Sequence, residues 1–173
     1  LAYNRSNKLV YSAAFLKRHV GLGPNGLGAI YATDPTAATS SLFVDMVALG
    51  INVGQASVPS NAARGLGAPN APSTDAAVFD LVGKVGLGDI DLSEDDSTLY
   101  VMSLNDKTIY AINVASKTLT GSFPVPNPSC VGGTWRPFAL KYYRNGLYVG
   151  GVCDAQTSTL AADMRAVVYR FDG

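Results

Sequence analysis

An internal repeat constrains the fold of this 173-residue chain more than any single residue does. Three segments with leucine at the second position align with one another: KLVYSAA (8–14), TLYVMSL (98–104) and GLYVGGV (146–152). Each is followed by a segment with an aligned tyrosine: GAIYATD (28–34), KTIYAIN (107–113) and AVVYRFD (166–172). Such recurrence of short strands is typical of β-propeller blades. The sequence therefore predicts an all-β fold, a β-propeller fragment of about three four-stranded blades.

The middle repeat defines the strands of one blade. Its apolar and polar alternation predicts strands over 88–93, 98–104, 107–114 and 118–125, separated by short polar turns and ended by Pro126. In the third repeat, Asn145-Gly146 is a strong hairpin signal. All of 1–173 is assigned to one propeller domain, with these approximate parts: blade 1 over 1–47, an insertion over 48–85, blade 2 over 86–126, and an incomplete blade 3 over 136–173.

The lengths of equivalent connections indicate where the chain is elaborated. From the aligned leucine to the aligned tyrosine there are 11 residues in the middle repeat and 22 in each outer repeat. The connection between the first two repeats is longer than the next by 31 residues. In a four-stranded antiparallel blade both kinds of connection emerge at one end, so we expect the long loops on one face. A short helix is an alternative interpretation of two segments. These are 73–83 inside the insertion and 41–47, for which a strand is the preferred interpretation.

The repeat also leaves the predicted ring incomplete. The chain begins partway through the first strand of one blade and ends on the third strand of another. Because a propeller needs on the order of four to eight blades, we expect the missing blades to come from the rest of a longer polypeptide or from a companion chain.

Composition and local motifs argue against several classes of ligand. With 13 basic and 13 acidic residues and no apolar run of membrane-spanning length, the sequence predicts neither nucleic-acid binding nor membrane insertion. The glycines at 21, 23 and 26 match a dinucleotide fingerprint, but a β-rich segment follows where that fingerprint requires a helix. The acidic run 89–95 lacks the glycine and glutamate of a calcium loop. The sequence therefore predicts no cofactor and no metal.

The two cysteines of the chain indicate in which cellular compartment the protein is found. Cys130 follows the last strand of the second blade and Cys153 ends a strand of the third, so both are expected on the elaborated face. The preferred interpretation is a disulfide between them, which would place the protein outside the cytosol. The alternatives are two unrelated buried thiols or, with less support, a metal site that includes the single histidine.

Six residues are candidates for binding a ligand or partner. The same template places all six at the elaborated end, where exposed aromatic and arginine side chains commonly anchor partners. They are Lys17, Arg18, His19, Asp89, Trp135 and Arg136. The turns at 94–98 and 144–146, at the other end, are expected to contribute less.

Longer stretches resemble a known kind of protein region. AAFLKRHVGLGPNGLGAIY, VGKVGLGDIDLSEDDSTLYV and WRPFALKYYRNGLYVGGVCDAQ are similar to the N-terminal β-propeller region of large bacterial surface or secreted proteins that often carry SdrD B-like repeats. The resemblance covers most of 7–34 and 83–172. It implies a secreted, modular protein of the cell surface, adhesin-like or part of a matrix, and it implies no catalytic residues.

Together these observations predict an extracellular or cell-surface propeller module for binding or structural interaction, with a glycan or surface protein as a possible partner. The alternative is a propeller enzyme of the lactonase or lyase type. Such an enzyme would place its site at the channel mouth, where Asp89 and Arg136 are the ionisable residues that the template provides.

Overall fold

A computed structural model of the protein describes residues 1–68 and 70–172. Pro69 of the predicted insertion and Gly173 of the predicted third blade lie outside the described residues. The described residues form β-strands joined by loops, with 3-10 turns at Gly26–Gly28, Gln55–Ser57, Ala76–Val78 and Ala161–Asp163. The prediction of an all-β fold is confirmed.

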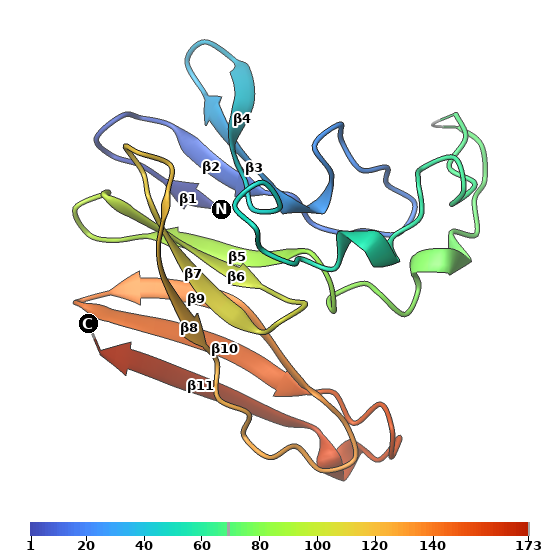
Figure 1. Ribbon diagram of the computed structural model, residues 1–173. Coiled ribbons are helices and arrows are strands. Elements are labelled where there is room, and N and C mark those ends of the chain that lie inside the picture. Colours follow the sequence, from blue (N-terminus) through green and yellow to red (C-terminus); the bar gives the residue numbers. More distant parts are fainter. Residues whose placement is uncertain (69, 173) are drawn as a thin grey trace.

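The strands form three antiparallel sheets (Figure 1). The first contains β1 (Ala2–Tyr3), β2 (Val10–Ala13), β3 (Ala29–Asp34) and β4 (Thr39–Asp45), paired in that order. The second contains β5 (Leu87–Leu92), β6 (Thr98–Ser103), β7 (Thr108–Asn113) and β8 (Leu119–Pro124). The third contains β9 (Trp135–Tyr143), β10 (Gly146–Cys153) and β11 (Arg165–Asp172). The described strands do not close into a barrel.

The two segments that were open to a helix have different outcomes. Residues 41–45 belong to β4, so the strand interpretation is confirmed there. Within 73–83 the regular structure is the single 3-10 turn Ala76–Val78. The hairpin between β9 and β10 is also shifted by one residue from the expected Asn145-Gly146 turn. Tyr143 pairs with Gly146, and the loop residues Arg144 and Asn145 both have positive φ, as a two-residue type I′ turn requires.

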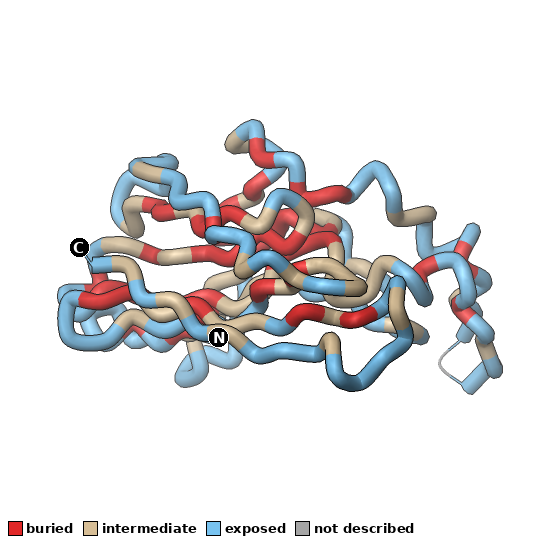
Figure 2. The backbone as a smooth tube through the Cα atoms, turned by 90° about the horizontal axis from the view of Figure 1, so that it is seen from below, coloured by how far each residue is buried: buried red, intermediate tan, exposed pale blue. Residues whose placement is uncertain are grey.

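Two apolar clusters form the core. One joins the first sheet, the insertion and the second sheet through buried residues such as Ile30, Val53 and Ile90. The other lies between the second and third sheets and includes Met102 and Trp135. Figure 2 shows most of the buried stretches toward the middle of the molecule and mainly exposed stretches at its periphery. The sheets therefore depend on one another, because each buries its apolar face against the next.

The first strands of the three sheets are neighbours: β5 packs against β1 and β9. Side chains join β5 to β9, since no backbone ladder connects them in the described residues. The Asp89 carboxylate accepts the Leu140 amide at 3.2 Å, and the Asp91 carboxylate accepts the Tyr142 amide at 2.7 Å. Lys141 also forms an ion pair of 2.9 Å with Asp91. Acidic side chains thus satisfy backbone donors at the edge of β9.

The long connections contact one another at one end of the strands, at the right in Figure 1. Residues 14–28 bind the insertion, the insertion reaches residue 156, and residue 132 binds residues 157 and 158. We call these connections (14–28, 46–86, 125–134 and 154–164) the loop face. The tight turns at 93–98 and 144–145 lie at the opposite end, which we call the turn face.

Candidate functional site

A buried ion pair fixes the insertion to the first sheet. Arg64 contacts Asp75 through Nε at 3.0 Å and Nη2 at 2.7 Å, and neither side chain is exposed to solvent. The same Nη2 donates to the carbonyls of Lys17 at 3.0 Å and Val20 at 3.1 Å. Hydrogen bonds from Arg64, and then from the His19 amide, hold the pKa of Asp75 at about 2 despite its burial. The pair is therefore charged at neutral pH and joins two loops distant in sequence.

The predicted residues Lys17, Arg18 and His19 lie along this junction. The Lys17 carbonyl accepts from Arg64, while its side chain is exposed. Arg18 donates to the Thr74 carbonyl, and its guanidinium lies 5.1 Å from the centre of the Phe79 ring. His19 has positive φ, and its ring nitrogen lies 2.9 Å from the Ser73 hydroxyl. The structure thus brings the three residues together with the insertion, and their role in binding a partner stays a prediction.

Asp89 and Arg136 have separate partners. Asp89 binds the β9 edge, as described above, whereas Arg136 Nε donates to Asp154 at 2.8 Å. Burial alone would raise the pKa of the Asp154 carboxyl. Hydrogen bonds from the Thr134 and Gln156 amides, and then from Arg136, lower this pKa to about 2. Asp154 therefore stays ionised and holds Arg136 in place. Whether Asp89 and Arg136 belong to a site of the lactonase or lyase type stays a prediction.

Trp135 is a correction to the expected surface. The prediction of an exposed aromatic anchor is wrong, because this side chain is 1% exposed and packs edge-on against Tyr169, with ring centres 6.0 Å apart. The β9–β10 register shifts at Gly150/Gly151, and a Cβ at Gly151 would lie 2.7 Å from the Trp135 ring. The indole needs the space that this glycine leaves, which makes Trp135 a core residue of the third sheet.

The cysteine prediction is confirmed, since Cys130 and Cys153 form a disulfide with their Cα atoms 5.4 Å apart. The bridge connects the 125–134 loop to the end of β10. Within residues 1–68 and 70–172, no group of three or more His, Cys, Asp or Glu side chains could hold a metal ion. The same residues contain no helix of the length and apolarity that a membrane span requires.

The loop face carries a groove of about 520 Å³ between the insertion and the third sheet. One side is formed by residues 79–84, and the other by β9, β10 and the start of the 154–164 loop. Phe79 is 63% exposed beside it, and Phe138 and Val152 are also exposed. Lys84 Nζ reaches across and donates to the side-chain amide oxygen Oε1 of Gln156 at 2.7 Å. Arg136 thus lies in a groove of mixed character, with apolar side chains beside the Arg136–Asp154 ion pair.

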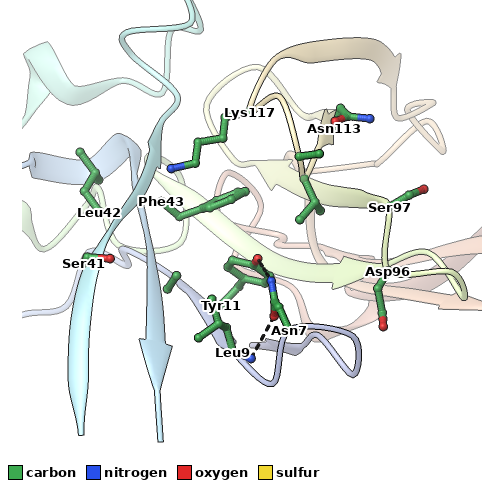
Figure 3. A pocket seen from close by; sticks show the side chains of 13 residues that line it. Asn7, Leu9, Tyr11, Ser41, Leu42, Phe43, Asp96, Ser97, Asn113 and Lys117 are labelled. Atoms are coloured by element: carbon green, nitrogen blue, oxygen red, sulfur yellow. Dashed lines mark hydrogen bonds between the residues drawn. The ribbon is translucent and has the colours of Figure 1, made fainter. Parts of the chain in front are cut away.

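A second pocket, of about 480 Å³, lies between the first and second sheets near the turn face (Figure 3). Figure 3 shows Tyr11 and Phe43 from the first sheet at its centre, with Lys117 of the second sheet above Phe43. The ammonium of Lys117 lies 5.3 Å from the centre of the Phe43 ring. The sequence did not predict this pocket, because its residues come from two repeats and none belongs to a recognisable ligand-binding motif. The turn face therefore has a concave site too.

Comparisons with known proteins find distant relatives of this chain. No family model matches the chain. Similar proteins include two from Dictyostelium discoideum: Colossin-D is 25% identical over 169 residues, or 90% of this chain, and Colossin-A is 29% identical over 181 aligned residues, or 99% of it. The chain spans 16% of the length of Colossin-D and 2% of that of Colossin-A. Both relatives are from Dictyostelium, so the resemblance to bacterial surface proteins stays a prediction.

Proposed function

We propose that the three sheets are consecutive blades of a β-propeller-type domain and that this domain is an extracellular module for binding or structural interaction. The aligned repeats and the adjacency of β1, β5 and β9 support the blade assignment. The Cys130–Cys153 disulfide supports an oxidising, extracytosolic location. The outer edge of β11 pairs with none of the described strands, and in this proposal it takes a strand from the remainder of the propeller or from a companion chain.

The loop face is the surface through which we propose that the module binds its partner. The observation that carries this proposal is the buried Arg64–Asp75 pair, because it gives a long insertion one defined position. An ordered surface loses less conformational entropy on binding than a mobile loop does. The ordered surface presents Arg18 over Phe79, together with the groove that contains Arg136. Arginine and aromatic side chains are the residues that most often dominate binding energy at interfaces.

A photo-crosslinking experiment tests which face meets a partner. Benzoylphenylalanine is placed at Phe79 on the loop face or at Tyr143 near the turn face, both of which are exposed. The two proteins are then irradiated in the extracellular medium of the producing cells. We expect one recurrent adduct, with a surface protein or a companion chain, from position 79 and not from position 143.

Alanine substitutions then test the same face with the purified partner. We expect Arg18→Ala and Arg136→Ala to weaken its affinity about tenfold or more, by analogy with arginine anchors at other interfaces. Asp95→Ala and Arg144→Ala are the matched controls from the turn face, for which we expect less than a threefold effect. Equal effects on both faces, or adducts from position 143 alone, would remove the argument for the loop face. Binding to immobilised glycans and to no protein would replace the protein partner in the proposal.

A further inference from the structure

We propose that the pocket between the first two sheets is a separate binding site for a small carboxylate with a flat apolar body, such as an arylalkanoate. Its volume of about 480 Å³ lies within the range of roughly 300–1,000 Å³ usual for small-molecule sites. Such sites combine apolar walls with a few polar groups that fix the ligand's orientation. This pocket has both features, and it is independent of the loop face.

The equivalent junction in the next repeat provides an internal comparison. Between the second and third sheets, the corresponding space is only about 100 Å³. Aromatic side chains fill it: Tyr100 and Tyr142 stack with ring centres 5.4 Å apart, and Phe123 and Phe171 line the remainder. At the first junction the second sheet contributes no aromatic ring to the lining, whereas the third sheet contributes Tyr142 and Phe171 at the second junction, so less of the space is filled. The open volume is thus a property of this junction and not of the repeat.

The walls of the pocket suit a flat apolar group. Tyr11 and Phe43 form its floor, with ring centres 4.6 Å apart and planes inclined by 51°. Leu9, Leu42 and Val114 complete the apolar lining. Because an aromatic ring buries apolar area and packs well against other rings, a planar group fits this surface better than a branched polar one does.

One cationic group and one hydroxyl give the pocket its preference for an anion. Lys117 forms no ion pair with the described residues, and its ammonium lies over the Phe43 ring at the rim. The Tyr11 hydroxyl accepts a hydrogen bond from Asn7 Nδ2 at 3.0 Å, so its own proton is left to donate. A carboxylate accepts from both kinds of donor.

The acidic residue of the pocket, Asp96, already binds other residues through its carboxylate. The Asp96 carboxylate accepts the Ser6 amide at 3.0 Å and the Ser6 hydroxyl at 2.9 Å, and it pairs with Arg5 at 3.5 Å. Figure 3 shows its side chain directed away from Tyr11 and Phe43. The negative charge of Asp96 is therefore balanced by its own partners, and Lys117 sets the charge at the open rim.

Binding of 3-phenylpropionate to the 173-residue chain tests the proposal, with 3-phenylpropanamide as the uncharged probe. For a probe of this size we expect saturation at about millimolar concentration, observed by NMR as shifts of the Tyr11 and Phe43 ring signals. The amide should bind about tenfold more weakly, because hydrogen bonds to charged groups are the stronger ones. The Lys117→Met variant should likewise bind 3-phenylpropionate about tenfold more weakly than the wild type does. Lys107→Met is the matched control, a turn lysine with nearly the same φ (57° against 58°) outside the pocket.

A filling variant separates this site from binding elsewhere on the surface. Ala32→Phe places a ring in the pocket, and we expect it to abolish the ligand-induced shifts of the ring signals. The amide signals of the second and third sheets should stay those of the folded protein. If that variant does not fold, Lys117→Met with its control decides the question, because Lys117 is exposed and its replacement leaves the core intact. Absence of saturable shifts up to about ten times the expected concentration, or equal binding by Lys117→Met and Lys107→Met, would overturn the proposal. Equal binding of the acid and the amide would overturn its carboxylate part.

Discussion

Removal of Arg64 should release the insertion while leaving the three sheets folded. In Arg64→Ala, the Asp75 carboxylate stays in a fully buried position without its cation, and the carbonyls of Lys17 and Val20 lose a donor. Breaking a buried ion pair from one side costs about 3–5 kcal/mol. The insertion can avoid that cost by opening locally. We therefore expect amide protection in the insertion to fall by about a hundredfold or more, at 1.36 kcal/mol per factor of ten.

Hydrogen exchange resolved by residue measures this effect. The Leu66 amide, which bonds to the Asn61 carbonyl, reports on the insertion, and the Val101 amide in β6 reports on the sheets. Arg170→Ala is the control, because its ion pair with Asp172 joins side chains that are 53% and 76% exposed. An exposed pair contributes only about 0–1 kcal/mol. Unchanged protection at Leu66 in Arg64→Ala, or an equal loss at Val101, would refute the reasoning.

The same pair should make the insertion sensitive to acid. The folded protein lowers the pKa of Asp75 from 3.8 to about 2. A group with a lowered folded pKa stabilises the folded state above its unfolded pKa, and this contribution is lost as the pH falls through the folded value. We expect Leu66 protection to be constant above about pH 5 and to decline from about pH 4 toward pH 2. In Arg64→Ala this decline should shrink, because the partner that lowers the pKa is gone.

Three further outcomes follow from the third sheet and its junction. Cys153→Ser should lower the free energy of urea unfolding by about 3 kcal/mol relative to the oxidised wild type, for a 23-residue separation, and the reduced wild type should match the variant. Trp135→Ala should lower the free energy of unfolding by about 3–5 kcal/mol, measured by thermal unfolding, because the indole is buried. A variant of unchanged stability that only loses partner binding would contradict this role in the core. Asp91→Ala leaves the Tyr142 amide without its acceptor and should speed exchange at that amide, whereas unchanged exchange would mean that water replaces the carboxylate.

Local patterns predicted most of the strands. The template strand 98–104 corresponds to β6, and the structure extends the repeat to the pairing in the later sheets, where Leu99 lies opposite Ile112 and Leu147 opposite Phe171. In the first sheet the pairing of β2 with β3 is shifted by one residue from this pattern. The disulfide was predictable for the same reason as the strands, because the template placed both cysteines at one end of neighbouring sheets.

The parts that escaped prediction depend on contacts between distant segments. Trp135 stands beside an arginine in a polar connection, which suggested exposure, and only the gap at Gly151 shows that the indole turns inward. Arg64 and Asp75 lie in a stretch without periodicity, so nothing local indicated that they pair. The Lys117 pocket lies between two sheets, and its open volume depends on side chains from both.

The bonds from Asp89 and Asp91 to β9 have a consequence for how such chains can be recombined. The two carboxylates are two residues apart, as are the Leu140 and Tyr142 amides that they meet, so a slip of one residue would present Ile90 to a backbone donor. Backbone ladders specify the order of strands within a sheet, whereas this Asp-x-Asp pair specifies how one sheet is aligned on the next. A chimera joined between β8 and β9 should keep its junction when the preceding sheet supplies the same two carboxylates. Sheets of this kind can then be exchanged as whole units, with a few edge residues setting which neighbours are compatible.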